Sequence, residues 1–142
     1  MAIVFNKADS SFKLKSPSIL KKWIISCIQS EEKEAGRIAI ILCSDDYLLK
    51  MNQDFLQHDY YTDIITFDYS EWPVVSGELY ISSDRVEDNA HKNHVHPQNE
   101  MQRVIIHGVM HLCGYKDKKK SEQSEMRTKE NFYLEKLSKL AL

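Results

Sequence analysis

Two histidines four residues apart are the strongest chemical signal in the sequence. His107 and His111 lie in the run HGVMHLCGYKD, and Gly114 and Asp117 follow at intervals of three residues. In a helix, positions four apart differ by about 40° in azimuth and about 6 Å in height, so both imidazoles point the same way. Gly114 permits the positive φ that ends a helix, and the returning chain brings Asp117 to the same side. The spacing predicts a metal site with three protein ligands and an open position for water.

Hydrogen-bonded core histidines are the alternative explanation for a bare H-x3-H pair. The added glycine and aspartate favour the metal site. Cys113 lies two residues after His111, about 200° around the helix, so we expect it to pack in the core instead of joining the ligands. His91, His94 and His96 form H-x2-H-x-H, which could bind metal, but a solvated helix end is the favoured interpretation of this polar segment, and His58 is expected on the surface.

Extended zincin metalloproteases use the same ligand spacing. Their general base is a glutamate directly after the first histidine, and here that position is Gly108. A zincin-like metallopeptidase would therefore lack its base, and it stands as an alternative to the interpretation that follows.

Three sequence blocks, in order, resemble the YbeY family of metal-dependent endoribonucleases. HGVMHLCGY, with a ligand three residues after its glycine, resembles the family signature. Upstream, MNQDF followed by TDIITF (62–67) is similar to the family's LN…TDVLSF block, and GELYIS (77–82) is similar to its GDI-x-IS strand. Met126 falls where the family often has a methionine. The resemblance extends over about residues 38–140.

The resemblance implies an enzyme that cuts single-stranded RNA. It implies a role in maturation of the 3′ end of 16S ribosomal RNA and in ribosome quality control, with RNA and the ribosome as partners. The ion on His107, His111 and Asp117 would be Zn²⁺ or another divalent metal. Asp63 and Glu78 are candidate proton acceptors or supports of the ligands, although each is equally typical of a structural role. A non-catalytic ribosome-assembly factor with a structural metal is a second alternative.

Two positions depart from the family pattern. The family's third ligand is usually the histidine of GYDH, whereas the run here is Gly114-Tyr115-Lys116-Asp117. Aspartate is a competent zinc ligand, but it makes the site harder and more negative, which is expected to weaken the preference for zinc. The family also carries an arginine shortly after its LN pair, and the matching position here is Leu56. A contact between that arginine and RNA would be vacant or moved to another basic residue.

Four lysines surround the third ligand and are candidates for binding RNA: Lys116, Lys118, Lys119 and Lys120. A solvated loop is the alternative for this run. Tyr60 or Tyr61 is a candidate for stacking on a base, with packing in the core as the alternative.

Composition limits the remaining possibilities. The 142 residues suit one domain, and 42% hydrophobic with 28% charged residues argues against bulk disorder. A formal net charge of −2 means that a nucleic acid must be met by a local patch. The three cysteines are odd in number and far apart, as is typical of reduced thiols. With no secretion signal and no apolar run long enough to cross a bilayer, a cytosolic protein without a membrane partner is expected. The sequence does not specify an oligomeric state.

Hydrophobic periodicity predicts the elements that position these residues. Strands are expected at 2–5, 37–43, 63–69 and 77–82, and helices at 17–33, 45–55, from 83 or 84, from 97 and from 121. Ser16 and Ser44 are predicted helix N-caps. The predicted apolar face of the last helix comprises Met126, Phe132, Leu134, Leu137 and Leu140. We predict one α+β domain over residues 1–142, with a small mixed sheet, about five helices and a zincin-like metal site on a helix of the C-terminal half.

Overall fold

A computed structural model describes residues 3–57 and 61–140. The elements in chain order are β1 (Ile3–Lys7), α1 (Pro17–Ser30), β2 (Glu34–Cys43), α2 (Asp45–Leu56), β3 (Ile64–Asp68), β4 (Val74–Ser82), α3 (Ser83–Lys92), α4 (Pro97–Leu112) and α5 (Lys120–Leu140). Ala2 of the first predicted strand, and the predictions for His58 and Tyr60, lie outside the described residues.

The strands form one mixed sheet in the order β1-β2-β4-β3. β1 and β4 run parallel to β2, and β3 runs antiparallel to β4. Alternate side chains of β2 and β4 are buried, as expected of a sheet with one face against helices. The predicted α+β class with a small mixed sheet is confirmed.

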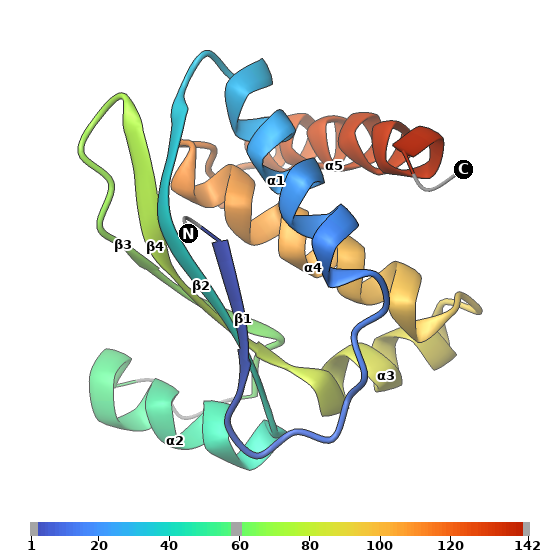
Figure 1. Ribbon diagram of the computed structural model, residues 1–142. Coiled ribbons are helices and arrows are strands. Elements are labelled where there is room, and N and C mark those ends of the chain that lie inside the picture. The colour runs from blue at the N-terminus through green and yellow to red at the C-terminus, as the bar shows by residue number, and fades with distance from the viewer. Residues whose placement is uncertain (1–2, 58–60, 141–142) are drawn as a thin grey trace.

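Helices cover the two faces of the sheet unequally (Figure 1). α1, α4 and α5 lie on one side, where the main core includes Trp23, Ile40 and Ile105. α2 lies on the other side over a small second cluster of Cys43, Leu48 and Ile65. The side with three helices therefore holds α4, which carries His107 and His111, and α5, which begins after Asp117.

Serine hydroxyls start two of the helices. Ser44 Oγ accepts the N–H of Tyr47 at 3.1 Å, which confirms the predicted cap of α2. Ser82 caps α3 in the same way, through the N–H of Arg85 at 3.1 Å. The prediction for Ser16 was wrong in its mechanism. Ser16 precedes α1 in a left-handed conformation with φ 53°, and its side chain makes no capping bond.

The buried face of α5 differs from the predicted one. Met126 and Leu137 are buried as predicted, but Phe132 and Leu140 are 59% and 50% exposed. Glu130 and Tyr133 complete the buried stripe instead, because positions 126, 130, 133 and 137 share one side of a helix. Trp23 Nε1 donates to the Tyr133 carbonyl at 2.8 Å and ties α1 to α5. The docking of α5 thus carries an acidic side chain into the interior.

The three cysteines, Cys27, Cys43 and Cys113, are free and buried, as predicted. Among the described residues, no helix combines the length and the apolar character that a membrane crossing requires.

Candidate metal centre

α4 ends where the sequence predicts, at a glycine that turns the chain back. Gly114 has φ +106°, its N–H donates to the His111 carbonyl at 3.0 Å, and the Tyr115 N–H donates to the Met110 carbonyl at 3.0 Å. This pair of bonds is a Schellman C-cap, which requires a residue that tolerates positive φ. The reversal returns the chain along α4 and delivers Asp117 to the face that carries the histidines.

The three predicted ligands meet at one point. The Nε2 atoms of His107 and His111 are 3.0 Å apart, and Asp117 Oδ2 lies 3.2 Å from each of them. Ligand atoms of a tetrahedral site with bonds of about 2.0–2.1 Å stand about 3.3 Å from one another. Two imidazole nitrogens and one carboxylate oxygen at this spacing can hold one divalent ion. This is the geometry that the i, i+4 spacing predicts.

Both imidazoles are oriented by acceptors behind them. Glu130 Oε2 lies 2.7 Å from His107 Nδ1, and the Tyr115 carbonyl lies 2.9 Å from His111 Nδ1. Neither acceptor can donate, so each Nδ1 carries the hydrogen and each Nε2 presents its lone pair at the meeting point. Such outer partners fix ring orientation and raise ligand basicity in metal sites.

Sequence reasoning missed Glu130. The residue is only 5% exposed, and the second oxygen of its carboxylate accepts from Arg103 Nη1 at 2.8 Å. A signal was present, because Glu130 follows Met126 by four residues and so falls on the apolar stripe of α5. A charged residue on an apolar stripe needs a partner, and here the partners are His107 and Arg103.

Glu130 and His107 shift each other's pKa in opposite directions. Burial lowers the pKa of His107, but the hydrogen bond and charge of Glu130 raise it by more, so the net shift is upward. Burial raises the pKa of Glu130, whereas its bonds to His107 and Arg103 outweigh burial and the net shift is downward. Glu130 therefore acts as a fixed negative charge behind the ligand.

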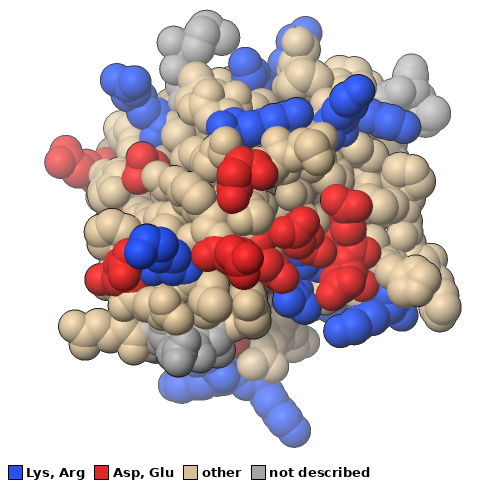
Figure 2. Space-filling view, turned by 90° about the horizontal axis from the view of Figure 1, so that it is seen from below, with Lys and Arg blue, Asp and Glu red and all other residues tan. Residues whose placement is uncertain are grey.

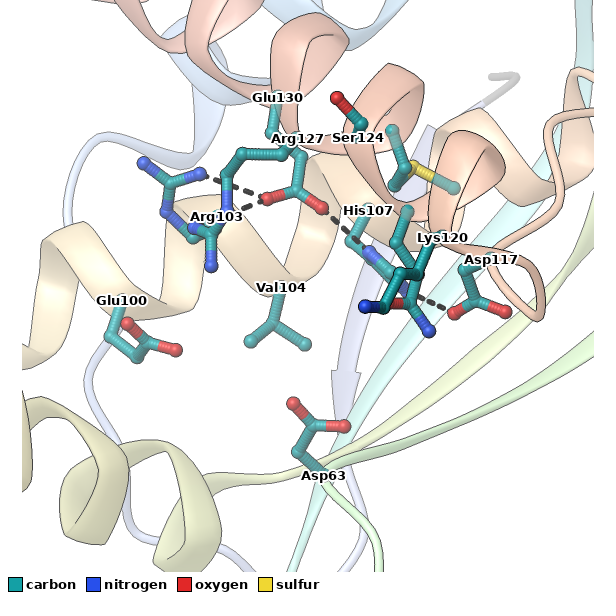
Figure 3. Close-up of a pocket in the computed structure, with 12 residues that line it drawn as sticks. Asp63, Glu100, Arg103, Val104, His107, Asp117, Lys120, Ser124, Arg127 and Glu130 are labelled. Atoms are coloured by element: carbon teal, nitrogen blue, oxygen red, sulfur yellow. Dashed lines mark hydrogen bonds and ion pairs between the residues drawn. The ribbon is translucent and has the colours of Figure 1, made fainter.

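A cleft of about 680 Å³ opens beside the three ligands. Figure 3 shows Asp63 pointing into it, across from Val104 of α4, with Glu100 at one end. Burial is the main cause that raises the pKa of Asp63, and also that of Glu100. The cleft gives a substrate access to the metal centre and places two proton-binding groups on its walls.

The other predicted site residues are scattered. Of the four lysines near Asp117, Lys120 lines the cleft, whereas Lys116 lies in a different depression with Glu31. Lys118 and Lys119 are exposed. The side chain of Glu78 lies on the opposite face of the sheet, where it accepts from the hydroxyl of Tyr69 at 3.2 Å.

The candidate for base stacking does not line the cleft either. Tyr61 is exposed, and its ring packs on the guanidinium of Arg85 at 5.6 Å. Leu56, at the position of the family's arginine, is the last residue of α2 and is exposed. The structure thus brings Asp63 and Lys120 to the ligands and leaves Glu78, Tyr61 and Lys116 elsewhere.

Gly108, between the two histidines, has a packing reason to be glycine. A Cβ on this residue would stand 2.7 Å from Ile64 Cδ1 and 2.9 Å from Leu79 Cδ1. α4 therefore rests directly on the sheet at the point where His107 faces the cleft. A side chain at the position that carries the general base in a zincin peptidase would require Ile64 and Leu79 to move here.

Comparison with known proteins identifies the family. A family model described as Endoribonuclease YbeY matches residues 4–138. The chain belongs to the YbeY endoribonuclease family. The resemblance seen in the sequence is thereby confirmed.

Relatives within this family match nearly the whole chain. The protein named Endoribonuclease YbeY in Cytophaga hutchinsonii is 45% identical over 130 residues, 91% of either chain. Its counterpart in Azobacteroides pseudotrichonymphae is 43% identical over 137 residues, 96% of this chain and 99% of the relative. A solution structure of TM1509 from Thermotoga maritima superposes with a TM-score of 0.68 at 29% identity, covering 95% of this chain and 88% of that one.

Proposed function

We propose that this chain is a metal-dependent endoribonuclease that cuts single-stranded RNA, and that residues 1–142 form one YbeY-like metallo-hydrolase domain. The observation that carries the proposal is the convergence of His107 Nε2, His111 Nε2 and Asp117 Oδ2 beside an open cleft. The names of its relatives support RNA as the substrate. Its role would be maturation of the 3′ end of 16S rRNA and ribosome quality control, in the cytoplasm where ribosomes are found.

His107, His111 and Asp117 are the proposed ligands, and Zn²⁺ is the proposed ion. Two imidazoles with one carboxylate form a donor set that zinc accepts in catalytic sites. A bound divalent ion supplies Lewis acidity toward a phosphoryl oxygen and lowers the pKa of an attacking water. Glu130 holds the His107 ring in the tautomer and orientation that ligation requires.

Asp63 is the proposed proton acceptor. Its carboxylate points into the cleft across from the wall that carries His107 (Figure 3). Because burial raises its pKa, the carboxylate binds a proton more readily near neutral pH than an exposed aspartate does. It would accept the proton of the attacking group, which is either a water or the RNA's own 2′-hydroxyl.

Cleavage of labelled single-stranded and duplex RNA tests the proposal. We expect the single strand to be cut, a chelator to stop cleavage and added Zn²⁺ to restore it. A substrate with a 2′-deoxy sugar at the cut site separates the routes, since only attack by the 2′-hydroxyl requires that group. Cleavage of casein without cleavage of RNA would instead identify a peptidase. Normal rRNA processing in cells carrying a folded His111→Ala variant would indicate a non-catalytic assembly factor.

A further inference from the structure

One face of α5 presents two cations to the cleft, Lys120 close to the metal ligands and Arg127 farther along the helix. Lys120 and Arg127 both line the cleft and are seven residues apart, which places them on the same side of the helix about 10.5 Å apart along its axis. Figure 3 shows Lys120 beside Asp117 at one end and Arg127 beside Arg103 at the other, with His107 between them. We call Lys120 and Arg127 the α5 cation pair.

Both cations have donors that the protein does not use. Neither the Lys120 nor the Arg127 side chain makes a hydrogen bond to another described residue. Arg127 has one long ion pair, 3.7 Å to Glu130 Oε1, and its side chain is 63% exposed. That oxygen already accepts from Arg103 at 2.8 Å. Arg103 is occupied with Glu130 and with Asn131 at 2.9 Å, whereas the α5 cation pair is available to a ligand.

The opposite wall of the cleft is unsuited to an anion. Asp63 lies there, across from α4, and α4 adds the carboxylate of Glu100 at one end and apolar Val104 on the side away from α5. Ionised carboxylates repel phosphate and accept hydrogen bonds from donor groups such as the amino groups of bases. The charges of the cleft are therefore asymmetric: positive along α5 and negative with an apolar patch across from it.

Resting on the proposed function, we propose that the α5 cation pair binds two phosphates of the RNA backbone. We call this phosphate-binding path the track. Arg127 binds the phosphate on one side of the scissile phosphate, and Lys120 binds the phosphate on the other side. The bases then face Asp63, Val104 and Glu100. The two residues are about 10.5 Å apart along the helix axis, a spacing that suits a chain of phosphodiesters with its middle phosphate at the metal ligands.

The salt dependence of RNA binding tests the track. The affinity of the full-length, chelator-treated protein for a short fluorescent single-stranded oligoribonucleotide is measured by anisotropy at several salt concentrations. Each phosphate contact contributes a slope of about −0.7 to log K against log salt for a single strand. We expect Arg127→Gln and Lys120→Gln each to make the slope shallower by about 0.7, and the double variant to lose about 1.4.

Matched variants control for the general loss of positive charge. Arg37→Gln removes an arginine on the opposite face of the sheet, beside Glu78. Lys139→Gln removes an exposed lysine near the far end of α5, where it pairs with Glu135 at 3.9 Å. Both controls are expected to keep the slope of the unaltered protein. Metal content of Arg127→Gln and Lys120→Gln is expected to be unchanged, which separates loss of the track from damage to the ligands.

The possible failures are distinguishable. If the unaltered protein binds and cleaves single-stranded RNA but both α5 variants keep its salt slope, the track is refuted and the nuclease proposal stands. A slope reduced equally by the α5 and control variants would also refute the track, since it would indicate a diffuse charge effect. If the unaltered protein neither binds nor cleaves single-stranded RNA, both proposals fall.

Discussion

Two regions of this molecule gather carboxylates, and only one of them resembles a reactive site. The first is the metal centre with its cleft. The second, the acidic end, comprises Asp9, Asp45 and Asp84 where α2 and α3 begin. Figure 2 shows acidic side chains collected on the face from which these helices start.

At the acidic end the protein itself satisfies the carboxylates. Asp9 accepts from the backbone N–H and hydroxyl of Ser44 at 2.8 and 2.6 Å, and Asp84 accepts the N–H of Asp45 at 3.0 Å. Asp45 in turn accepts from Ser82 and from Arg85, both at 2.7 Å. Carboxylates at helix N-termini with these partners stabilise the fold and have little capacity left for a ligand.

At the metal centre, the acceptors converge where the chain supplies no donor. Asp117 Oδ2 and two imidazole nitrogens face one another at 3.0–3.2 Å. The pKa directions also differ: Ser44 lowers the pKa of Asp9, whereas burial raises the pKa of Asp63 and Glu100. The comparison shows that convergence without an internal donor, and not the number of acidic residues, distinguishes a metal site.

The largest expected effect is on metal binding. Asp117→Asn replaces an anionic ligand by a neutral amide, so metal affinity should fall. The fall should be larger than the loss of about 10–100-fold that is typical when a residue hydrogen-bonded to a ligand is changed. Metal analysis should find about one equivalent in the unaltered protein and almost none in the variant. Asp45→Asn, the matched change at the acidic end, should keep full occupancy. Equal metal content in the two variants would remove Asp117 from the ligand set.

The outer partner of His107 should have the next largest effect. Glu130→Gln keeps the size of the side chain but removes the charge that orients the imidazole, so metal affinity should fall by about 10–100-fold. Competition with a chromogenic chelator measures this change, with Asp84→Asn as the control. An unchanged affinity in a folded Glu130→Gln protein would reduce Glu130 to a structural ion-pair partner of Arg103.

Folding stability should show the reverse order in metal-free protein. Asp45→Asn breaks a 2.7 Å ion pair with partly buried Arg85 and should lower the free energy of unfolding by about 1–2 kcal/mol. Asp117 accepts no hydrogen bond from the two histidines, because each Nε2 presents a lone pair. Asp117→Asn should therefore change the free energy of unfolding by less than about 0.5 kcal/mol. Urea unfolding in the presence of a chelator measures both. A larger loss for Asp117→Asn would mean that the ligand also braces the fold.

The smallest effects should be opposite in sign and dependent on pH. Because the folded-state pKa of Asp63 is raised, its charge opposes folding at neutral pH, and Asp63→Asn should stabilise the metal-free protein. This gain should shrink as the pH falls below the folded-state pKa. Because the folded-state pKa of Asp9 is lowered, Asp9→Asn should destabilise at neutral pH, and that loss should vanish as the pH falls through the folded-state pKa. Unfolding midpoints across pH measure both, and a common sign would contradict the contrast.

Several features followed from short stretches of sequence. The i, i+4 histidines, the helix stop at Gly114 and the cap at Ser44 each depend on backbone geometry within one or two turns. The mixed α+β class followed from periodicity for a similar reason. The side chains chosen for the face of α5 were partly wrong, because Phe132 is exposed while Glu130 is buried, and helical register was decided by docking.

The sequence by itself predicted the three candidate ligands and the turn that brings them together, because these residues span one helix end and local geometry suffices. Only the tertiary structure decided what surrounds them. Glu130 reaches His107 because α5 packs on α4, and Asp63 enters the cleft because β3 begins beside that wall. It also separated Lys120 from Lys116 and Asp63 from Glu78, because Lys116 lies in the loop before α5 and Glu78 lies on the far face of β4. Contacts between distant segments depend on how whole faces pack, and no local spacing encodes them.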